Sequence, residues 1–240
     1  MSSAGPVLLI TSAITASAAR TAVGDADVRL QATVEALRHW RRMVSPARIV
    51  ICDGSNFNFE GSEFAAEFEG FELLRFQNEL PSVIRYGKGW GEGAIVAHAL
   101  LHSQRLKRAE CFAKCTSKLW VENFGALPRS VASDFAFDFY GGWHPVRLDT
   151  RFYMAKVQAF KAHLMQAYVR VDEPAGLDLE TVYAQALAAL PLSQYVAPWS
   201  PAIGGLSGSM GSHYAAQLNR ARLKGWRNRL IRLKSAIRWL

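Results

Sequence analysis

The chain has 240 residues, of which 50% are apolar and 20% are charged. This length and composition exclude a disordered chain, a collagen-like polymer and a disulfide-stapled miniprotein. No apolar run approaches the roughly 18–20 residues that cross a bilayer, so we expect no transmembrane helix. The three cysteines are too few and odd in number for a disulfide framework, which suits a reducing cytoplasm.

The positive charge of the chain is concentrated near its C-terminus. Eight Lys and Arg residues lie between Arg220 and Arg238, they equal the whole formal net charge of +8, and no Asp or Glu follows Glu180. The basicity therefore belongs to a C-terminal tail rather than to the whole surface.

The first third of the chain predicts alternating strands and helices. Apolar runs bounded by turn residues predict strands over residues 7–14, 47–52 and 71–76. Between the first two runs, apolar residues at helical spacing predict a helix with Asp25 or Asp27 as its cap. This order is typical of an α/β fold with parallel strands.

The rest of the chain first continues this alternation and then changes to shorter predicted strands and helices. A glycine-rich stretch over residues 86–92 predicts a loop before a helix, and a fourth strand follows over residues 111–123. Further strands and helices are predicted over residues 134–140, 150–155, 157–171 and 179–190, before a Pro/Gly/Ser-rich segment over 198–211. We expect one domain over residues 1–211, with halves 1–125 and 126–211, and a basic helix over residues 212–240.

Six apolar residues of the tail recur at spacings of three and four, which places them on one face of an α-helix. They are Leu223, Trp226, Leu230, Leu233, Ile237 and Leu240. A stripe flanked by basic residues indicates an anionic membrane surface as partner through residues 220–240. The alternative is that the stripe packs on the protein's own body. Nucleic acid is the least favoured partner, since zinc-finger and RNP signatures are missing.

Polar residues cluster at the predicted ends of parallel strands, where open α/β sheets bind ligands. They are Thr11 and Ser12 after the first strand, Asp53 to Ser55 after the second, and Lys114 to Lys118 in the fourth. Turn chemistry is the alternative for each group alone, and their coincidence at one edge favours a site. Lys88, at a predicted helix start, is a phosphate or substrate contact, and a flexible connection is the alternative.

The segments VLLITSAI, IVICDGSN, YGKGWGE and CFAKCTSKLWVEN, in this order, resemble a group of small GT-A-type glycosyltransferases. These are encoded among bacterial capsule and lipopolysaccharide (O-antigen) synthesis genes. The likeness continues through Leu179-Glu180 and residues 201–209, and so covers nearly the whole chain. It implies a GT-A-like (Rossmann-like), mostly parallel sheet flanked by helices, with a nucleotide-binding half over 1–125 and an acceptor half over 126–211.

The sequence departs from this family at the fourth strand. Most GT-A enzymes end it in Asp-x-Asp, whose carboxylates hold a divalent metal against the donor's diphosphate, whereas residues 114–118 contain no carboxylate. Positive charge is still needed because breaking the sugar–phosphate bond builds negative charge on the diphosphate. The resemblance thus implies a transferase without metal or cofactor, in which Lys114, Lys118 and Lys88 hold the phosphates. The alternative is that these lysines line a solvent-exposed strand face.

The likeness to GT-A folds also implies where the substrates lie. Implied nucleotide contacts are Thr11, Ser12, Arg29, Asp53 and Ser55, and sugar or acceptor contacts are Glu92, Thr116 and Ser207. Strand alternation places Thr116 on the same face as Lys114 and Lys118. For Asp53, a turn-capping role is the alternative.

An inverting transfer, the stereochemistry we assume, needs a carboxylate to take the proton of the acceptor hydroxyl. Glu180 is the first candidate because Leu179-Glu180 lies in the acceptor half and matches the family-like pattern. Its alternative role is to satisfy a helix dipole. Asp138 is the second candidate, since the aromatic residues beside it can bind a sugar and raise its pKa by desolvation.

These features predict a cytoplasmic glycosyltransferase, peripheral on the inner membrane through its basic tail. Its donor is a nucleotide sugar, a UDP-sugar above all, and its acceptor is a glycan or lipid-linked glycan of a surface polysaccharide. Two other classes stay open. One is a non-catalytic nucleotide- or glycan-binding protein of GT-A fold, and the other is a nucleic-acid-associated α/β protein.

Overall fold

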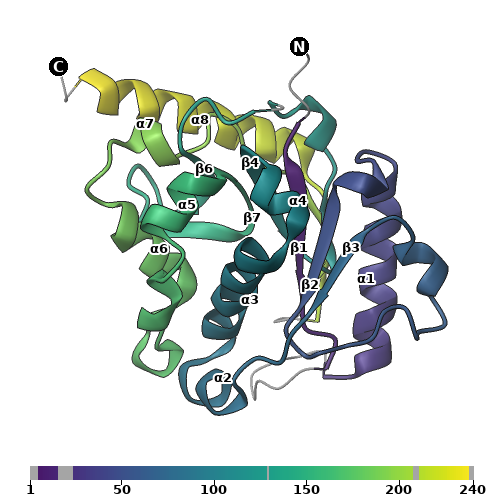
Figure 1. The fold of residues 1–240 in the computed structure, drawn as a ribbon. Helices are drawn as coiled ribbons and strands as arrows, with labels where there is room; N and C mark the ends of the chain where they lie inside the picture. The colour runs from purple at the N-terminus through teal and green to yellow at the C-terminus, as the bar shows by residue number, and fades with distance from the viewer. Residues whose placement is uncertain (1–4, 16–23, 129, 208–210, 238–240) are drawn as a thin grey trace.

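The protein is built on a six-stranded sheet with the order β3-β2-β1-β4-β7-β6 (Figure 1). The computed structural model describes residues 5–15, 24–128, 130–207 and 211–237. The strands are β1 (Val7–Ser12), β2 (Ile49–Asp53), β3 (Glu72–Arg75), β4 (Cys111–Thr116), β6 (Phe135–Tyr140) and β7 (Arg147–Lys156). Strands β1 to β4 are parallel, and β7 runs antiparallel to both β4 and β6. The predicted α/β class with a mostly parallel sheet is therefore confirmed.

Helices cover both faces of this sheet, because its buried strands present apolar side chains to both sides. The helices are α1 (Ala26–Arg41), α2 (Leu80–Tyr86), α3 (Lys88–His102), α4 (Gln104–Arg108), α5 (Val157–His163), α6 (Leu179–Leu187), α7 (Leu192–Tyr195) and α8 (Leu218–Ile237). In β1, Leu8 and Ile10 pack in the core that contains α1, whereas Leu9 packs in the core that contains α3, α5 and α6.

A small antiparallel sheet leads the chain away from β4. Its strands are β5 (Leu119–Val121), β8 (Ile203–Leu206) and β9 (His213–Tyr214), in the order β5-β8-β9. The prediction of one strand over residues 111–123 is wrong, because β4 ends at Thr116 and the chain turns before β5. The Ser117 amide donates to the Thr11 carbonyl oxygen (2.9 Å), which ties this turn to the end of β1. Lys118 lies in the turn and not on a strand face shared with Lys114.

The glycine-rich stretch is helical rather than a loop, contrary to the prediction. α2 ends at Tyr86, Gly87 has a φ of 104°, which glycine adopts at little cost, and α3 begins at Lys88. A Cβ at Gly93 would lie 2.1 Å from Tyr168 Cβ, so a glycine is needed where α3 meets its neighbours. Lys88 is the first residue of a long helix.

α8 packs on the body through a face other than the predicted apolar stripe. Its Asn228 is buried, whereas Leu223 and Trp226 of the stripe are exposed. The alternative that the stripe packs on the protein's own body is therefore wrong. The side chain of Ile237 and residue Leu240 fall outside the described part of the chain. Across the described ranges, no helix combines the length and apolarity needed to cross a membrane.

Gly205 in β8 is a position where we expect a side chain to destabilise the fold. Its φ is 112°, and a Cβ there would lie 2.2 Å from the Lys118 carbonyl oxygen. We expect Gly205→Ala to lower the free energy of unfolding by about 1–3 kcal/mol, because the backbone of the turn must move. Urea denaturation measures this change. Gly125→Ala is the control, since no atom lies within 4 Å of the added Cβ. An equal loss in both variants would contradict this account.

Candidate functional site

A pocket of about 300 Å³ lies at the carboxyl ends of β1 and β4. This is the edge at which open α/β sheets bind ligands. Nine predicted site residues line it: Thr11, Ser12, Arg29, Lys88, Glu92, Thr116, Lys118, Glu180 and Ser207. The other predicted residues, Asp53, Ser55, Lys114 and Asp138, do not line it. The pocket therefore joins residues from both halves of the chain.

Two side-chain oxygens of the pocket residues have no hydrogen-bond partner within the described part of the chain. They are Ser12 Oγ and Asn78 Oδ1. Buried polar groups are normally paired, because an unsatisfied one costs about 1–3 kcal/mol. A polar ligand that reaches these oxygens would remove that cost.

Asp53 and Ser55 shape the pocket wall without lining it. Asp53 is fully buried, and its Oδ2 accepts from the Ile14 amide (3.0 Å). Its Oδ1 accepts from the Ser55 amide (2.8 Å), the Ser55 hydroxyl (2.6 Å) and the Phe57 amide (3.1 Å). These bonds tie together the loops after β1 and β2. They agree with the turn-capping alternative for Asp53, whose enclosed carboxylate does not fit the predicted direct contact with a nucleotide. Ser55 is half-buried and lies outside the pocket lining, and its contact with a nucleotide stays a prediction.

Cationic side chains crowd the pocket. Those that line it are Arg29, Lys88, Lys118 and Arg151. Burial, and after it the positive charge of Arg29, lowers the pKa of Lys118 to about 7, although Glu92 and Asp53 oppose this shift. An anionic ligand would relieve the repulsion and restore the ammonium form. The electrostatics of the pocket therefore favour an anion.

Lys114 lies beneath the pocket rather than in it. Its side chain is 0% exposed. Its Nζ donates to the Glu92 carboxylate, to Thr116 Oγ1 (3.1 Å) and to the Thr150 carbonyl oxygen (2.8 Å). Neither the predicted phosphate contact nor the alternative of a solvent-exposed face fits an ammonium group enclosed in this way. Lys114 instead holds Glu92 in the pocket wall.

Glu180 faces the pocket from the first turn of α6. Its Oε1 accepts from Thr150 Oγ1 (3.0 Å), and Arg147 Nη2 lies 4.0 Å from Oε2. Burial raises the pKa of Glu180, the charges of Glu92 and Asp178 raise it further, and a backbone hydrogen bond opposes the rise. A carboxylate with a raised pKa in a ligand pocket suits a general base.

Arg151, Tyr140 and Tyr214 are pocket residues that the sequence does not predict. Asp149 holds the Arg151 guanidinium at two points, Nε to Oδ1 (2.9 Å) and Nη2 to Oδ2 (2.6 Å). The guanidinium carbon lies 5.7 Å and 5.0 Å from the ring centroids of Tyr140 and Tyr214, within the range of cation–π contacts. One feature of the sequence could have indicated Arg151. It is the one charged residue in the aromatic strand predicted over residues 150–155, where burying an unpaired charge is costly.

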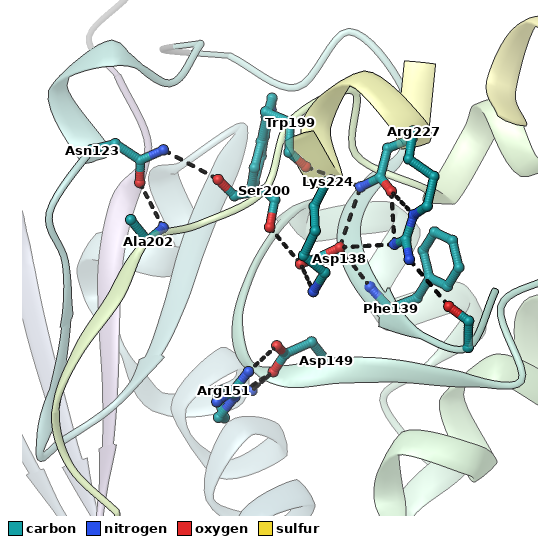
Figure 2. Close-up of polar contacts among 12 residues, drawn as sticks. Asn123, Asp138, Phe139, Asp149, Arg151, Trp199, Ser200, Ala202, Lys224 and Arg227 are labelled. Atoms are coloured by element: carbon teal, nitrogen blue, oxygen red, sulfur yellow. Dashed lines mark hydrogen bonds and ion pairs between the residues drawn. The ribbon is translucent and has the colours of Figure 1, made fainter. Parts of the chain in front are cut away.

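Asp138 lies in a buried cluster between β6 and α8 and not in the pocket (Figure 2). Its Oδ2 accepts from Ser200 Oγ (2.6 Å) and Lys224 Nζ (2.8 Å), and its Oδ1 accepts from Asn228 Nδ2 (3.2 Å). The residue is 1% exposed. An acceptor hydroxyl has no access to this carboxylate, so the prediction of Asp138 as an alternative base does not fit. Asp138 anchors α8 instead.

Comparisons with known proteins add no assignment, since no protein-family model and no curated protein matches this chain. Among the described residues, three or more His, Cys, Asp or Glu side chains do not gather as metal ligands would. The predicted metal independence stays a prediction. The site is therefore defined by its own geometry: a cation-lined pocket with a desolvated carboxylate, suited to anion binding and proton transfer.

The anchor role of Asp138 predicts a loss of stability in Asp138→Asn. The Asp138 side chain is 2% exposed and that of its partner Lys224 is 28% exposed, so removing the carboxylate charge weakens charged hydrogen bonds to a half-buried cation, and we expect the free energy of unfolding to fall by about 1.5–3 kcal/mol. Urea denaturation measures it. Asp134→Asn is the control. The side chains of Asp134 and Lys156 are 42% and 35% exposed, so their ion pair contributes at most about 1 kcal/mol to stability. Unchanged stability of Asp138→Asn would show that this carboxylate is not an anchor.

Proposed function

We propose that the chain is a glycosyltransferase of GT-A-like fold that transfers a sugar from a nucleotide-sugar donor, a UDP-sugar above all. Its acceptor would be a glycan or lipid-linked glycan of a bacterial surface polysaccharide. The observation that carries the proposal is one cavity, at the carboxyl ends of parallel strands, that combines cations with a desolvated carboxylate. The strand order is compatible with the fold that the resemblance implies. The proposal includes a cytoplasmic location at the inner membrane, which the cysteine content and the basic tail favour.

In this proposal the donor's diphosphate lies among Lys118, Lys88 and Arg29, and Arg151 joins this group. Thr11 and the hydroxyl of Ser12, which has no hydrogen-bond partner among the described residues, would face the nucleotide. These fixed cations would stabilise the negative charge that develops on the diphosphate as the sugar–phosphate bond breaks. Lys114 takes part indirectly, because its ion pair holds Glu92 in the wall.

Glu180 is the proposed base of the transfer. It takes the proton of the acceptor hydroxyl while that oxygen bonds to the anomeric carbon of the donor sugar. The bond from the anomeric carbon to the diphosphate oxygen breaks, and its electron pair leaves with the diphosphate. Glu92, Thr116 and Ser207 line the same cavity and would contact the sugar or the acceptor.

The base role predicts that Glu180→Gln separates turnover from binding. We expect hydrolysis or transfer from a UDP-sugar panel to fall by at least ~10²-fold while the Kd for UDP changes little. In the unmodified protein, turnover falls as the pH drops through the raised pKa of Glu180, because only the carboxylate accepts a proton. Assays with EDTA and with added Mn²⁺ test the predicted metal independence.

Glu110→Gln is the matched control for Glu180→Gln, since Glu110 is exposed and lies outside the pocket. Near-normal turnover in Glu180→Gln would remove this residue from the mechanism. If the unmodified protein binds UDP but turns over no donor with any acceptor, the non-catalytic nucleotide-binding class replaces the transferase.

The lowered pKa of Lys118 predicts that UDP binding weakens as the pH rises. The ammonium form binds the diphosphate, and the amine dominates above a pKa of about 7, so the affinity falls between about pH 7 and about pH 9. The slope is at most ~10-fold per pH unit for one proton. Calorimetric titration of UDP across this range measures it.

Lys118→Met should bind UDP more weakly and lose this pH slope. Lys88→Met removes another pocket cation but keeps Lys118, so its binding should weaken while the slope remains. If the affinity for UDP still falls with rising pH in Lys118→Met, the group whose protonation controls binding is not Lys118.

A further inference from the structure

The helix α8 carries two faces of opposite character. Its inner face is buried through residues that recur at helical spacing: Ala221, Gly225, Asn228, Ile231 and Ser235. A Cβ at Gly225 would lie 3.2 Å from Trp199 Cα, which shows how closely the helix approaches the body. The opposite face is exposed in the described part of the chain and carries a row of apolar side chains.

The outer face exposes large apolar side chains in one row. Leu223, Trp226, Leu230 and Leu233 are 73%, 66%, 43% and 63% exposed. Together with Leu218 they make up five of the twelve large apolar side chains that are exposed in the described part of the chain. Isolated exposed apolar residues are ordinary, but a contiguous row of this kind marks an interaction surface.

Polar anchors hold the inner face so that α8 cannot roll and bury the row. Lys224 donates to the buried carboxylate of Asp138 (Figure 2). Asn228 donates to the same carboxylate. Near the other end of the helix, the Leu192 amide donates to Ser235 Oγ (3.1 Å). Rolling the helix would leave Asp138 charged, buried and unpaired, which is strongly unfavourable. The outward direction of the row is therefore built into the fold.

Basic residues border the apolar row on both sides. Arg222 and Arg229 are seven residues apart and lie along one border, and Arg220, Arg227 and Lys234 lie along the other at the same spacing. Lys234 Nζ lies 4.7 Å from the ring centroid of Trp143, a further exposed aromatic side chain beside the helix. No acidic residue occurs in α8.

We propose that the outer face of α8 docks on an anionic lipid bilayer and lies in its interface. An apolar row with a tryptophan, bordered by cations, matches acyl chains below a layer of negative headgroups. A second copy of this chain would bring two basic borders together with no acidic residue of α8 to pair them. A nucleic acid would match the cations but not the apolar row.

The helix α8 and the α2 side of the pocket lie at different ends of the fold. In Figure 1, α8 runs along the top of the molecule toward the C-terminus, whereas α2, which contributes Leu80 and Val83 to the pocket, lies at the bottom. The helix therefore holds the protein at the bilayer without covering this side of the pocket. The inference does not depend on the proposed function.

The test is co-sedimentation of the full chain with vesicles. We expect binding to phosphatidylcholine vesicles that contain phosphatidylglycerol and at least ~10-fold weaker binding to phosphatidylcholine alone. Trp226→Glu combined with Leu230→Glu should weaken binding to the anionic vesicles by at least ~10-fold. Arg220→Gln combined with Arg222→Gln should weaken it less and make it less sensitive to salt, because fewer cation–headgroup attractions remain to be screened.

The matched control is Leu101→Glu combined with Val169→Glu, two exposed apolar residues outside α8 that should leave vesicle binding unchanged. UDP binding and thermal unfolding, measured on every variant, show that the fold and the pocket are intact and keep this test separate from that of the proposed function. Unchanged vesicle binding in Trp226→Glu/Leu230→Glu overturns the proposal. The proposal is also overturned if the unmodified protein does not bind vesicles and forms a dimer in sedimentation equilibrium. If Trp226→Glu/Leu230→Glu breaks that dimer, the outer face of α8 binds a second copy of the chain.

Discussion

The ion pair between the buried Lys114 and the half-buried Glu92 is the interaction on which the site depends. It joins β4 to α3, and the same ammonium group binds the Thr150 carbonyl oxygen on β7. The Thr150 hydroxyl in turn donates to Glu180, so one cation beneath the pocket connects the elements that carry both pocket carboxylates. Since an uncompensated buried charge costs several kcal/mol, these elements are held in one arrangement.

The pocket above this pair is electrostatically unusual because charges of both signs are desolvated within it. Burial pushes the pKa of Lys118 down and that of Glu180 up, so both groups are moved toward neutrality. An anionic ligand would restore the lysine charge, and its negative charge would raise the pKa of Glu180 further, which makes this carboxylate a stronger base. Anion binding and proton acceptance are therefore compatible in one cavity, which is the combination that the proposed transfer requires.

Most of the fold and part of the site follow from local patterns. Asp25, one of the two predicted caps, caps α1, because its carboxylate accepts from the amides of Asp27 and Val28. Glu180 and Lys118 reach the pocket because residues after parallel strands and at helix starts meet at one edge. Arg151 escaped prediction because the rings of Tyr140 and Tyr214 reach it only when β6 and β9 assemble beside β7, although its ion-pair partner Asp149 is two residues away on the same strand.

The sequence alone determined which segments form strands or helices. It also determined the basic tail and its apolar row, since periodicity and charge pattern are local properties. Tertiary packing decided which polar groups are buried and which reach the pocket. It enclosed Lys114, turned Asp138 into the anchor of α8, and pointed Leu223 and Trp226 outward. The physical reason is that the cost of burying a charge or exposing an apolar side chain depends on neighbours that are distant in the chain.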